Sequence, residues 1–550
     1  MTSDVELLSR KTGKGTRNSG RLKRLFRSPV FFVAVTAFLV AFAVQSGELG
    51  SADTVRRLQT THSFWTSEPA VLPQDYPEFG LHGRNGKLYG WYGMGQSLLM
   101  LPADIAGTYL EEADIFDQYR EDPTVRSIVV SYSTSILISV LVSLVCYRML
   151  GLLGFTAGQR MAGVLALLLG TTFLHYTQNM MENNYIMLLT LSGLTFQYEW
   201  VLTGSRRALL IGSAASGLNL LTRLTTAMDM AAIGFFLLLV LWLRGVRGRA
   251  LLARFAGYAK TAFPVYALFG VIDRLYQWYR FGSLFNTYVQ VFGREWKMLN
   301  PALPPAFPFE TPFRVGFLGP LITPEKSIFL FDPLLVLTIV GALLLWRRFA
   351  GEIRAYLLAF GALLLAYICF YAKFTVWSGD HAWGDRYVST AVQLVAFISM
   401  PLCLRHRAAV NRWVWRAGLA LVAVSVAVQL ASVAFWCPLE IYQRQMLGRP
   451  TCVAALRFKN IADVAAGRNP WGITPDSIED AWDYVHVTTF NFLPFALNRM
   501  GAAARWVVEV SFVLWFAALA GVIAMLIFLP RKARSGAFDN RASSAQRVEV

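Results

Sequence analysis

Charged side chains stand where apolar runs of the sequence end. Asp53 follows the first apolar run by a few residues, and Glu182 lies in a very short turn after the third. A positioned carboxylate can accept a proton from a hydroxyl or an amine, so both residues are candidates for a general base. The cations at similar places are Arg223, Lys326 and Arg386, and ionisable residues at the membrane edge are functional candidates by default.

The segments that position these residues read as membrane spans. Of the 550 residues, 55% are hydrophobic and only 15% are charged, whereas a soluble domain carries roughly a quarter charged residues. Apolar runs of about the 20 residues that a bilayer requires recur along the chain. The pattern predicts about twelve spans, near residues 29–45, 127–149, 160–178, 184–203, 207–222, 226–243, 258–276, 327–346, 354–373, 387–404, 414–435 and 506–529.

The distribution of basic residues gives the orientation. The first 27 residues hold eight Lys and Arg against two acidic residues, and further basic clusters follow alternate spans. The positive-inside rule places both termini in the cytoplasm of a bacterial inner membrane protein and the acidic segment 47–126 on the opposite face. The net charge of +17 lies between apolar spans rather than on a soluble domain. Nucleic acid is therefore not an expected partner.

Three outside segments, about 47–126, 277–326 and 437–505, are too long to be simple connections. They are dense in Trp, Tyr, Phe and Pro, so we expect ordered structure with helices lying at the membrane surface. The predicted organisation is a basic tail (1–27), a catalytic transmembrane core (28–405), C-terminal helices carrying the last outside segment (406–530) and a second tail (531–550). The predicted fold class is an all-α integral membrane protein.

The sequence lacks the motifs of common cofactor and metal sites in soluble enzymes. Gly90, Gly93 and Gly95 do not follow a strand that opens into a helix, so they do not form a dinucleotide fingerprint. The six histidines lack zinc-type spacing. Cys437 and Cys452 share the last outside segment, where an oxidising compartment allows a disulfide between them.

Taken in order, the outside motifs resemble the bacterial GT-C superfamily of polytopic glycosyltransferases, related to protein mannosyltransferases and the lipid A aminoarabinose transferase. The resemblance spans about residues 30–405. It rests on Asp53 after the first span, on Gly86-Lys87-Leu88-Tyr89 through Gly95 and Pro102, on Tyr279-Arg280-Phe281-Gly282-Ser283, on Pro324-Glu325-Lys326 before Asp332-Pro333, and on Trp383-Gly384-Asp385-Arg386-Tyr387. Where such families often have Asp-Glu, this chain has Asp53-Thr54.

The resemblance implies transfer of a sugar from a polyprenyl phosphate to a lipid, glycan or protein acceptor outside the membrane, with inversion at the anomeric carbon. Asp53 would be the base, Glu182 would orient the acceptor or help to hold a divalent ion, and Arg386, Lys326 and Arg223 would bind the donor phosphate. The sequence does not require a metal. Further candidates for the substrate cavity are Lys87, Tyr89, Tyr92, Arg280, Asp385 and Tyr387.

Two other readings stay open at this point. An envelope polysaccharide ligase or polymerase with a lipid-diphosphate donor would share the location and the chemistry. A transporter or flippase would also have about twelve spans, but its polar residues would be expected near the bilayer midplane and in inverted repeats. Here the polar residues gather on one side, and the sequence shows no convincing repeat, so an enzyme is favoured.

Overall fold

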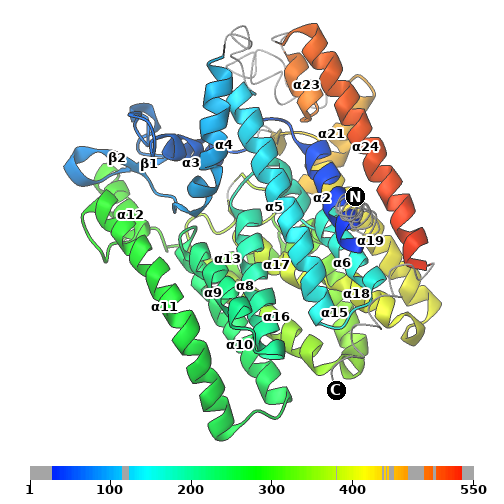
Figure 1. Ribbon diagram of the computed structural model, residues 1–550. Helices are drawn as coiled ribbons and strands as arrows, with labels where there is room; N and C mark the ends of the chain where they lie inside the picture. Colours follow the sequence, from blue (N-terminus) through cyan, green and yellow to red (C-terminus); the bar gives the residue numbers. More distant parts are fainter. Residues whose placement is uncertain are drawn as a thin grey trace, which may run out of the picture.

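The computed structural model describes residues 28–113, 123–379, 381–436, 439–440, 443–444, 451–468, 489–499 and 503–534. Helices dominate these ranges, and the strands described within them form one short hairpin. The long helices run side by side through the lower part of the molecule, and shorter elements gather above them (Figure 1). The prediction of an all-α polytopic membrane protein is confirmed.

Most predicted spans coincide with single helices to within a few residues. These are α2 (Pro29–Val44), α5 (Val125–Leu152), α8 (Asn183–Thr203), α9 (Arg206–Leu220), α10 (Ala227–Leu243), α16 (Gly351–Tyr371), α19 (Arg412–Ser432) and α24 (Arg505–Arg534). The span predicted at 258–276 falls inside a longer helix, α11 (Gly248–Phe281). Within the described residues, six helices are long and apolar enough to cross a membrane, by length and composition. The other predicted spans fall on shorter or interrupted helices.

Three predicted spans are interrupted. Residues 160–178 form α6 (Ala157–Gly170) and α7 (Phe173–Gln178), residues 327–346 form α14 (Ile328–Phe331) and α15 (Leu334–Leu345), and residues 387–404 form α17 (Ser389–Ala396) and α18 (Ser399–Arg405). Two of the breaks meet, because Asp332 accepts hydrogen bonds from the Thr172 backbone N–H at 2.7 Å and from the Thr172 hydroxyl at 3.0 Å. Pairing of this kind satisfies backbone groups that a broken helix would leave exposed to lipid.

The outside segments carry ordered elements, as expected. The first contains α3 (Ala52–His62), β1 (Gly80–His82), β2 (Leu88–Gly90) and α4 (Gly95–Glu111), the second contains α12 (Tyr288–Leu299) and α13 (Phe313–Ile322), and the third contains α21 (Val453–Ala465) and α23 (Leu493–Asn498). The β1–β2 hairpin is antiparallel, with Leu81 opposite Tyr89. In Figure 1 the hairpin and α12 lie together at one upper corner, beyond the end of α11.

Glycines let these outside elements approach the helix ends closely. A Cβ on Gly50, whose φ is +72°, would lie 2.6 Å from Asn179 Cα, and the Asn179 side chain donates to the Gly50 carbonyl at 2.7 Å. A Cβ on Gly93 would overlap the carbonyl oxygens of Leu221 and Thr222. The glycine-rich motif around Gly93 is therefore a contact surface for the connection between α9 and α10.

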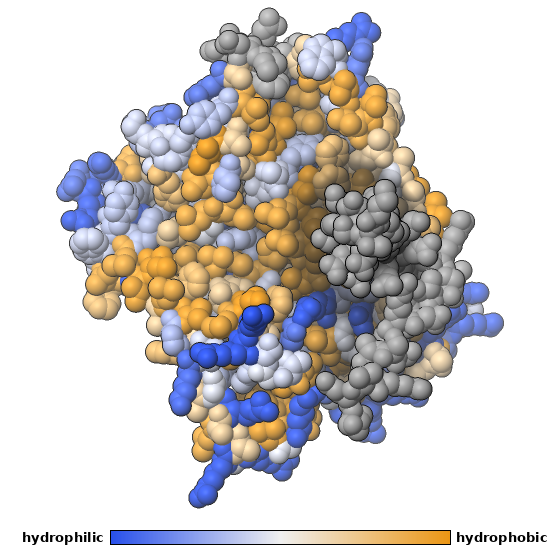
Figure 2. All heavy atoms as spheres, in the orientation of Figure 1, coloured by the Kyte–Doolittle hydropathy of each residue, from blue (hydrophilic) through white to orange (hydrophobic). Residues whose placement is uncertain are grey.

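Hydropathy divides the surface in the way a bilayer would. Figure 2 shows hydrophobic side chains in a band across the middle and hydrophilic ones around the hairpin and the lower helix ends. Helix α11 is nearly unshielded by protein, with Phe255 66%, Phe263 70% and Leu268 57% exposed. An apolar surface of this extent needs a lipid environment.

The close approach at Gly93 gives a first prediction. Gly93→Ala should lower the free energy of unfolding by about 1–3 kcal/mol, the usual cost of overpacking. The reason is that the new methyl group would overlap the carbonyl oxygens of Leu221 and Thr222. Differential scanning fluorimetry in detergent measures the change. Gly234→Ala in α10, where a Cβ would meet no atom within 4 Å, is the control, and equal melting temperatures for the two variants would contradict the packing described.

Candidate active site

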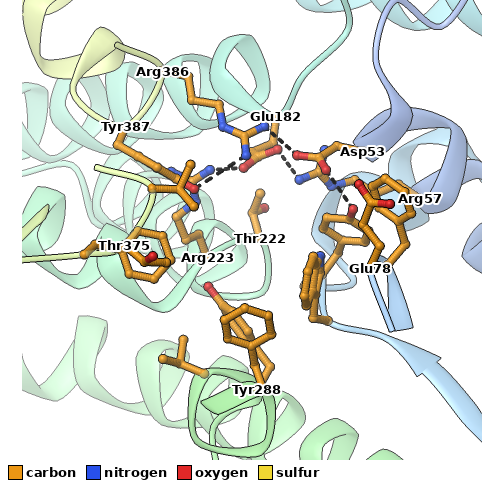
Figure 3. A pocket seen from close by; sticks show the side chains of 18 residues that line it. Asp53, Arg57, Glu78, Glu182, Thr222, Arg223, Tyr288, Thr375, Arg386 and Tyr387 are labelled. Carbon is orange, nitrogen blue, oxygen red and sulfur yellow. Dashed lines mark hydrogen bonds and ion pairs between the residues drawn. The ribbon is translucent and has the colours of Figure 1, made fainter. Parts of the chain in front are cut away.

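A cavity of about 220 Å³ lies where α3, the 179–182 turn, the α9–α10 connection, α12 and the segment before α17 converge. Figure 3 shows the side chains that line it: carboxylates and guanidinium groups gather along one side, and Tyr288 approaches from α12. The remaining lining is largely aromatic, including Trp91, Phe292 and Phe374. A cavity with apolar walls and a few convergent polar groups is the usual form of a small-molecule site.

Asp53 lies between a cation and a phenol in this cavity. Arg386 Nη1 donates to one carboxylate oxygen of Asp53 at 2.5 Å, and the Tyr92 hydroxyl donates to the other at 2.8 Å. The Asp53 and Arg386 side chains are 16% and 15% exposed. Both groups are thus mostly sheltered, yet a ligand in the cavity can reach them.

Glu182 lies between two further cations. Arg57 and Arg223 each form an ion pair with it, and the Glu182 side chain is only 6% exposed. Removing a charge this far from water is costly, and close opposite charges repay the cost only when the geometry is good. The Arg57 side chain is 6% exposed and the Arg223 side chain is 11% exposed. Each of the three buried charges is therefore stabilised by the opposite charge beside it.

Two tyrosine rings join these ion pairs into a closed ring. The Arg57 guanidinium lies over the ring of Tyr92 at 4.4 Å, while Arg223 and Arg386 both lie over the ring of Tyr387, at 5.1 and 5.2 Å. Guanidinium groups over aromatic faces are attracted to the ring electrons. We call the seven residues Asp53, Arg57, Tyr92, Glu182, Arg223, Arg386 and Tyr387 the charge ring.

The start of α3 positions two members of the charge ring. Ser51 caps the helix by accepting a hydrogen bond from the Thr54 backbone N–H, which places Asp53 in the first turn, where the helix dipole favours a negative charge. Arg57 follows four residues later on the same helical face. The Thr54 hydroxyl donates to the Met180 carbonyl at 3.1 Å, so α3 is fastened directly to the turn that carries Glu182.

Electrostatics keep both carboxylates ionised. Burial opposes ionisation of Asp53, but the guanidinium groups of Arg386 and Arg57 outweigh it and hold the pKa of this carboxyl below its usual value. Burial likewise opposes ionisation of Glu182, yet the charges of Arg57 and Arg223 leave its pKa lowered. The carboxylates therefore remain acceptors of protons and of hydrogen bonds across the ordinary pH range.

Two guanidinium nitrogens of the charge ring make no hydrogen bond to the described residues. Within the described part of the chain, Arg386 Nε and Arg57 Nη1 are buried and find no hydrogen-bond acceptor. Buried donors without a partner are unfavourable and rare, and both belong to residues that line the cavity. Because the two nitrogens are themselves buried, an anion in the cavity could accept these hydrogen bonds only after the guanidinium groups turn toward it.

The other predicted site residues lie around the cavity rather than in it. Buried Arg280 donates to the carbonyls of Gly90 at 2.5 Å and Tyr92 at 2.9 Å, and so fixes the strand end that carries Tyr92. Tyr89 packs edge-on against Tyr279. Lys87 is exposed at the hairpin.

Lys326 and Asp385 support the loop that carries Arg386. Lys326 Nζ donates to the carbonyls of Ala382 at 2.8 Å and Gly384 at 3.1 Å. Asp385 accepts a hydrogen bond from the Tyr387 backbone N–H at 3.0 Å, and burial raises its pKa to about 7. Neither side chain lines the active-site cavity.

The sequence reasoning overlooked Arg57, which pairs with Glu182 and helps to lower the pKa of Asp53. Its spacing of four residues from Asp53 was a usable signal, because a short polar helix there places both on one face. Tyr288 and Thr222 also line the cavity, and nothing in their local sequence marks them.

No three His, Cys, Asp or Glu side chains of the described residues are placed to share a metal ion. Glu182 accepts a hydrogen bond from Arg223 and forms an ion pair with Arg57 through its other oxygen, so both oxygens already lie against cations. Of the two cysteines predicted to form a disulfide, Cys437 lies outside the described residues, whereas Cys452 precedes α21.

The charge ring predicts an unusual sensitivity at Glu182. Glu182→Gln leaves Arg57 and Arg223 buried without their counter-charge, so the free energy of unfolding should fall by roughly 3–5 kcal/mol. Glu199→Gln is the matched control, because its partner Arg148 is 49% exposed and such surface pairs contribute under about 1 kcal/mol. Thermal unfolding in detergent compares the two, and a Glu182→Gln protein as stable as the control would argue against a buried ring.

Comparisons with known proteins add one finding. No family model matches the chain, and no curated protein matches it significantly. The matching solved structures include that of ArnT from Cupriavidus metallidurans bound to undecaprenyl phosphate, at 14% sequence identity and a TM-score of 0.41, covering 94% of this chain and 80% of that one. A likeness of this degree assigns neither substrate nor residue roles to this chain.

Proposed function

We propose that this protein is a membrane glycosyltransferase that moves a sugar from a polyprenyl-phosphate donor to an acceptor on the outer face of the bacterial inner membrane. The observation that carries the proposal is the charge ring, which places a carboxylate, three guanidinium groups and unused buried donors around one cavity. A base and an anion-binding group within one cavity are what this transfer requires.

Asp53 is the proposed base. It would take the proton from the acceptor hydroxyl or amine as that group attacks the anomeric carbon from the face opposite the phosphate. The bond between the anomeric carbon and the phosphate oxygen then breaks, and the configuration inverts. Tyr92 holds the second carboxylate oxygen at 2.8 Å, which fixes the orientation of the oxygen that accepts the proton.

Arg386 is the proposed first contact of the departing phosphate, with Arg223 and Arg57 behind it. A guanidinium has five donors in a planar fork, which suits a phosphate group. Because Arg386 lines the cavity and its Nε has no hydrogen-bond acceptor among the described residues, a small turn of the guanidinium would let the phosphate bind beside the ion pair with Asp53. Its negative charge would offset that of the guanidinium and raise the pKa of Asp53, so the base becomes stronger when the donor is bound.

The lipid part of the donor fits the surroundings of the cavity. Tyr288 and Phe292 of α12 line the cavity, and Phe285, just before this helix, is 86% exposed. A long isoprenoid chain in the bilayer would find an apolar surface there, with its phosphate at the membrane boundary. We propose from the charge pattern of the sequence that this boundary is the outer one and that both termini are cytoplasmic.

Substitution of the base tests the proposal. Asp53→Asn keeps the shape of the side chain but removes the proton acceptor, so sugar transfer should fall by roughly a hundredfold to ten-thousandfold. Transfer is measured with purified protein, radiolabelled polyprenyl-phosphate sugars and membrane extracts as the source of acceptor. Glu112→Gln, an exposed carboxylate of the same outside segment, should retain activity near that of the wild type.

Full transfer by a well-folded Asp53→Asn protein would rule out Asp53 as the base. The pH dependence gives a second readout. Because the pKa of Asp53 is lowered in the free enzyme, kcat/KM should hold down to a pH below the ordinary range of an aspartate, about 3.9. Replacing Arg386 with Gln removes the main lowering charge, so the loss of kcat/KM at acid pH should begin at a higher pH.

A further inference from the structure

A second cavity of about 260 Å³ lies behind the loop that carries Arg386. It lies between the turn before α14, this loop, and the side chains of Glu440, Arg444 and Val453. Its volume is many times the roughly 30 Å³ of a water molecule and close to the lower end of small-molecule sites, about 300 Å³. None of the residues that line it belongs to the charge ring.

One stretch of chain separates the two cavities. Thr375 and Val376 line the active-site cavity, whereas the next residues, Trp377 and Ser378, line the second one. Farther along, Ala382 and Trp383 face the second cavity, and Arg386 faces the first. A ligand in the second cavity would therefore lie against the other side of the wall that holds Arg386.

The charges around the second cavity balance. Arg444 Nη1 donates to Glu325 at 2.8 Å, and Lys326 and Glu440 add one positive and one negative charge. Glu440 is itself paired with buried Arg457. Lys326 Nζ in turn donates to the carbonyls of Ala382 and Gly384. Because each of these four charges already has a partner in the protein, the lining favours a neutral ligand with hydrogen-bonding groups over an ionic one.

Aromatic edges and hydroxyl groups complete the lining. The ring of Trp377 packs so closely on Gly319 that a Cβ there would overlap it, which holds the indole in place. Trp383 is 2% exposed, and its indole Nε1 donates to no group in the described ranges of the chain. Thr323 and Ser378 add hydroxyl groups.

We propose that the second cavity binds a neutral sugar unit of the acceptor, so that the acceptor is a glycan. The C–H face of a sugar ring can pack on an indole such as that of Trp377, and its hydroxyl groups can exchange hydrogen bonds with the hydroxyl groups of Thr323 and Ser378. The inference rests on the proposed function, which leaves the acceptor open among lipid, glycan and protein. The polyprenyl chain does not suit these charged walls, and a phosphate would meet Glu325 and Glu440.

Binding of oligosaccharides to the full-length protein in detergent tests the proposal. The probes are neutral tetrasaccharides of glucose, mannose and xylose, inorganic phosphate and undecaprenyl phosphate, each followed by isothermal titration. At least one tetrasaccharide should bind. Trp377→Ala should weaken that binding by about tenfold or more, and Ser378→Ala by roughly threefold to tenfold, while undecaprenyl phosphate binds as to the wild type.

Two further variants guard against a folding defect. Ser378→Trp fills the cavity and should abolish tetrasaccharide binding in a protein that still binds undecaprenyl phosphate. Trp506→Ala, at a side chain 66% exposed at the start of α24, should change neither. Arg386→Ala should weaken binding of undecaprenyl phosphate and leave tetrasaccharide binding intact.

The outcomes separate this inference from the function on which it rests. No tetrasaccharide binding, binding that survives Ser378→Trp, or competition by inorganic phosphate at this cavity would overturn the glycan subsite. If undecaprenyl phosphate fails to bind while a tetrasaccharide binds and depends on Trp377, the donor assignment falls and the sugar site stands.

Discussion

The Glu182 carboxylate, nearly out of contact with water, requires Arg57 and Arg223 beside it, and the remaining charges of the site follow from that requirement. Burying an ion costs several kcal/mol unless a close counter-charge offsets it. The counter-charges come from α3 and from the α9–α10 connection, so the fold must bring these elements to one point. Asp53 and Arg386 extend the same network and close it through the rings of Tyr92 and Tyr387.

Close backbone contacts and breaks in the helices allow these elements to meet at one point. Gly50 lets the start of α3 lie against Asn179, and Gly93 lets the segment after β2 lie against Thr222. The Arg386 loop is held from behind by Lys326, which donates to two of its carbonyls. The site is thus built at helix ends by the short elements of the long connecting segments, while the long helices supply the fixed frame. A ligand in either cavity would contact the stretch of chain that carries Arg386.

The sequence predicted the frame well and the site in part. Span positions followed from the length that a bilayer imposes, but hydropathy alone could not show the breaks at Thr172 and Asp332, where polar pairing replaces backbone hydrogen bonds. Asp53 and Glu182 were singled out because each follows the end of an apolar run, and the structure places both in one cavity. Arg57 was missed because α3 is short and polar. Lys326 was grouped with Arg386 by motif order, whereas its amino group binds the back of the loop.

The central claim is that the charge ring recognises the phosphate of a polyprenyl lipid. The most direct measurement compares the binding of undecaprenyl phosphate with that of the uncharged alcohol undecaprenol, in wild type and in Arg386→Ala. The account predicts that the phosphate binds more tightly than the alcohol and that Arg386→Ala removes most of this difference, roughly tenfold to a hundredfold for a charge-assisted contact of about 1.5–3 kcal/mol. Equal affinity for the two lipids in the wild type, or a phosphate preference unchanged in Arg386→Ala, would contradict it.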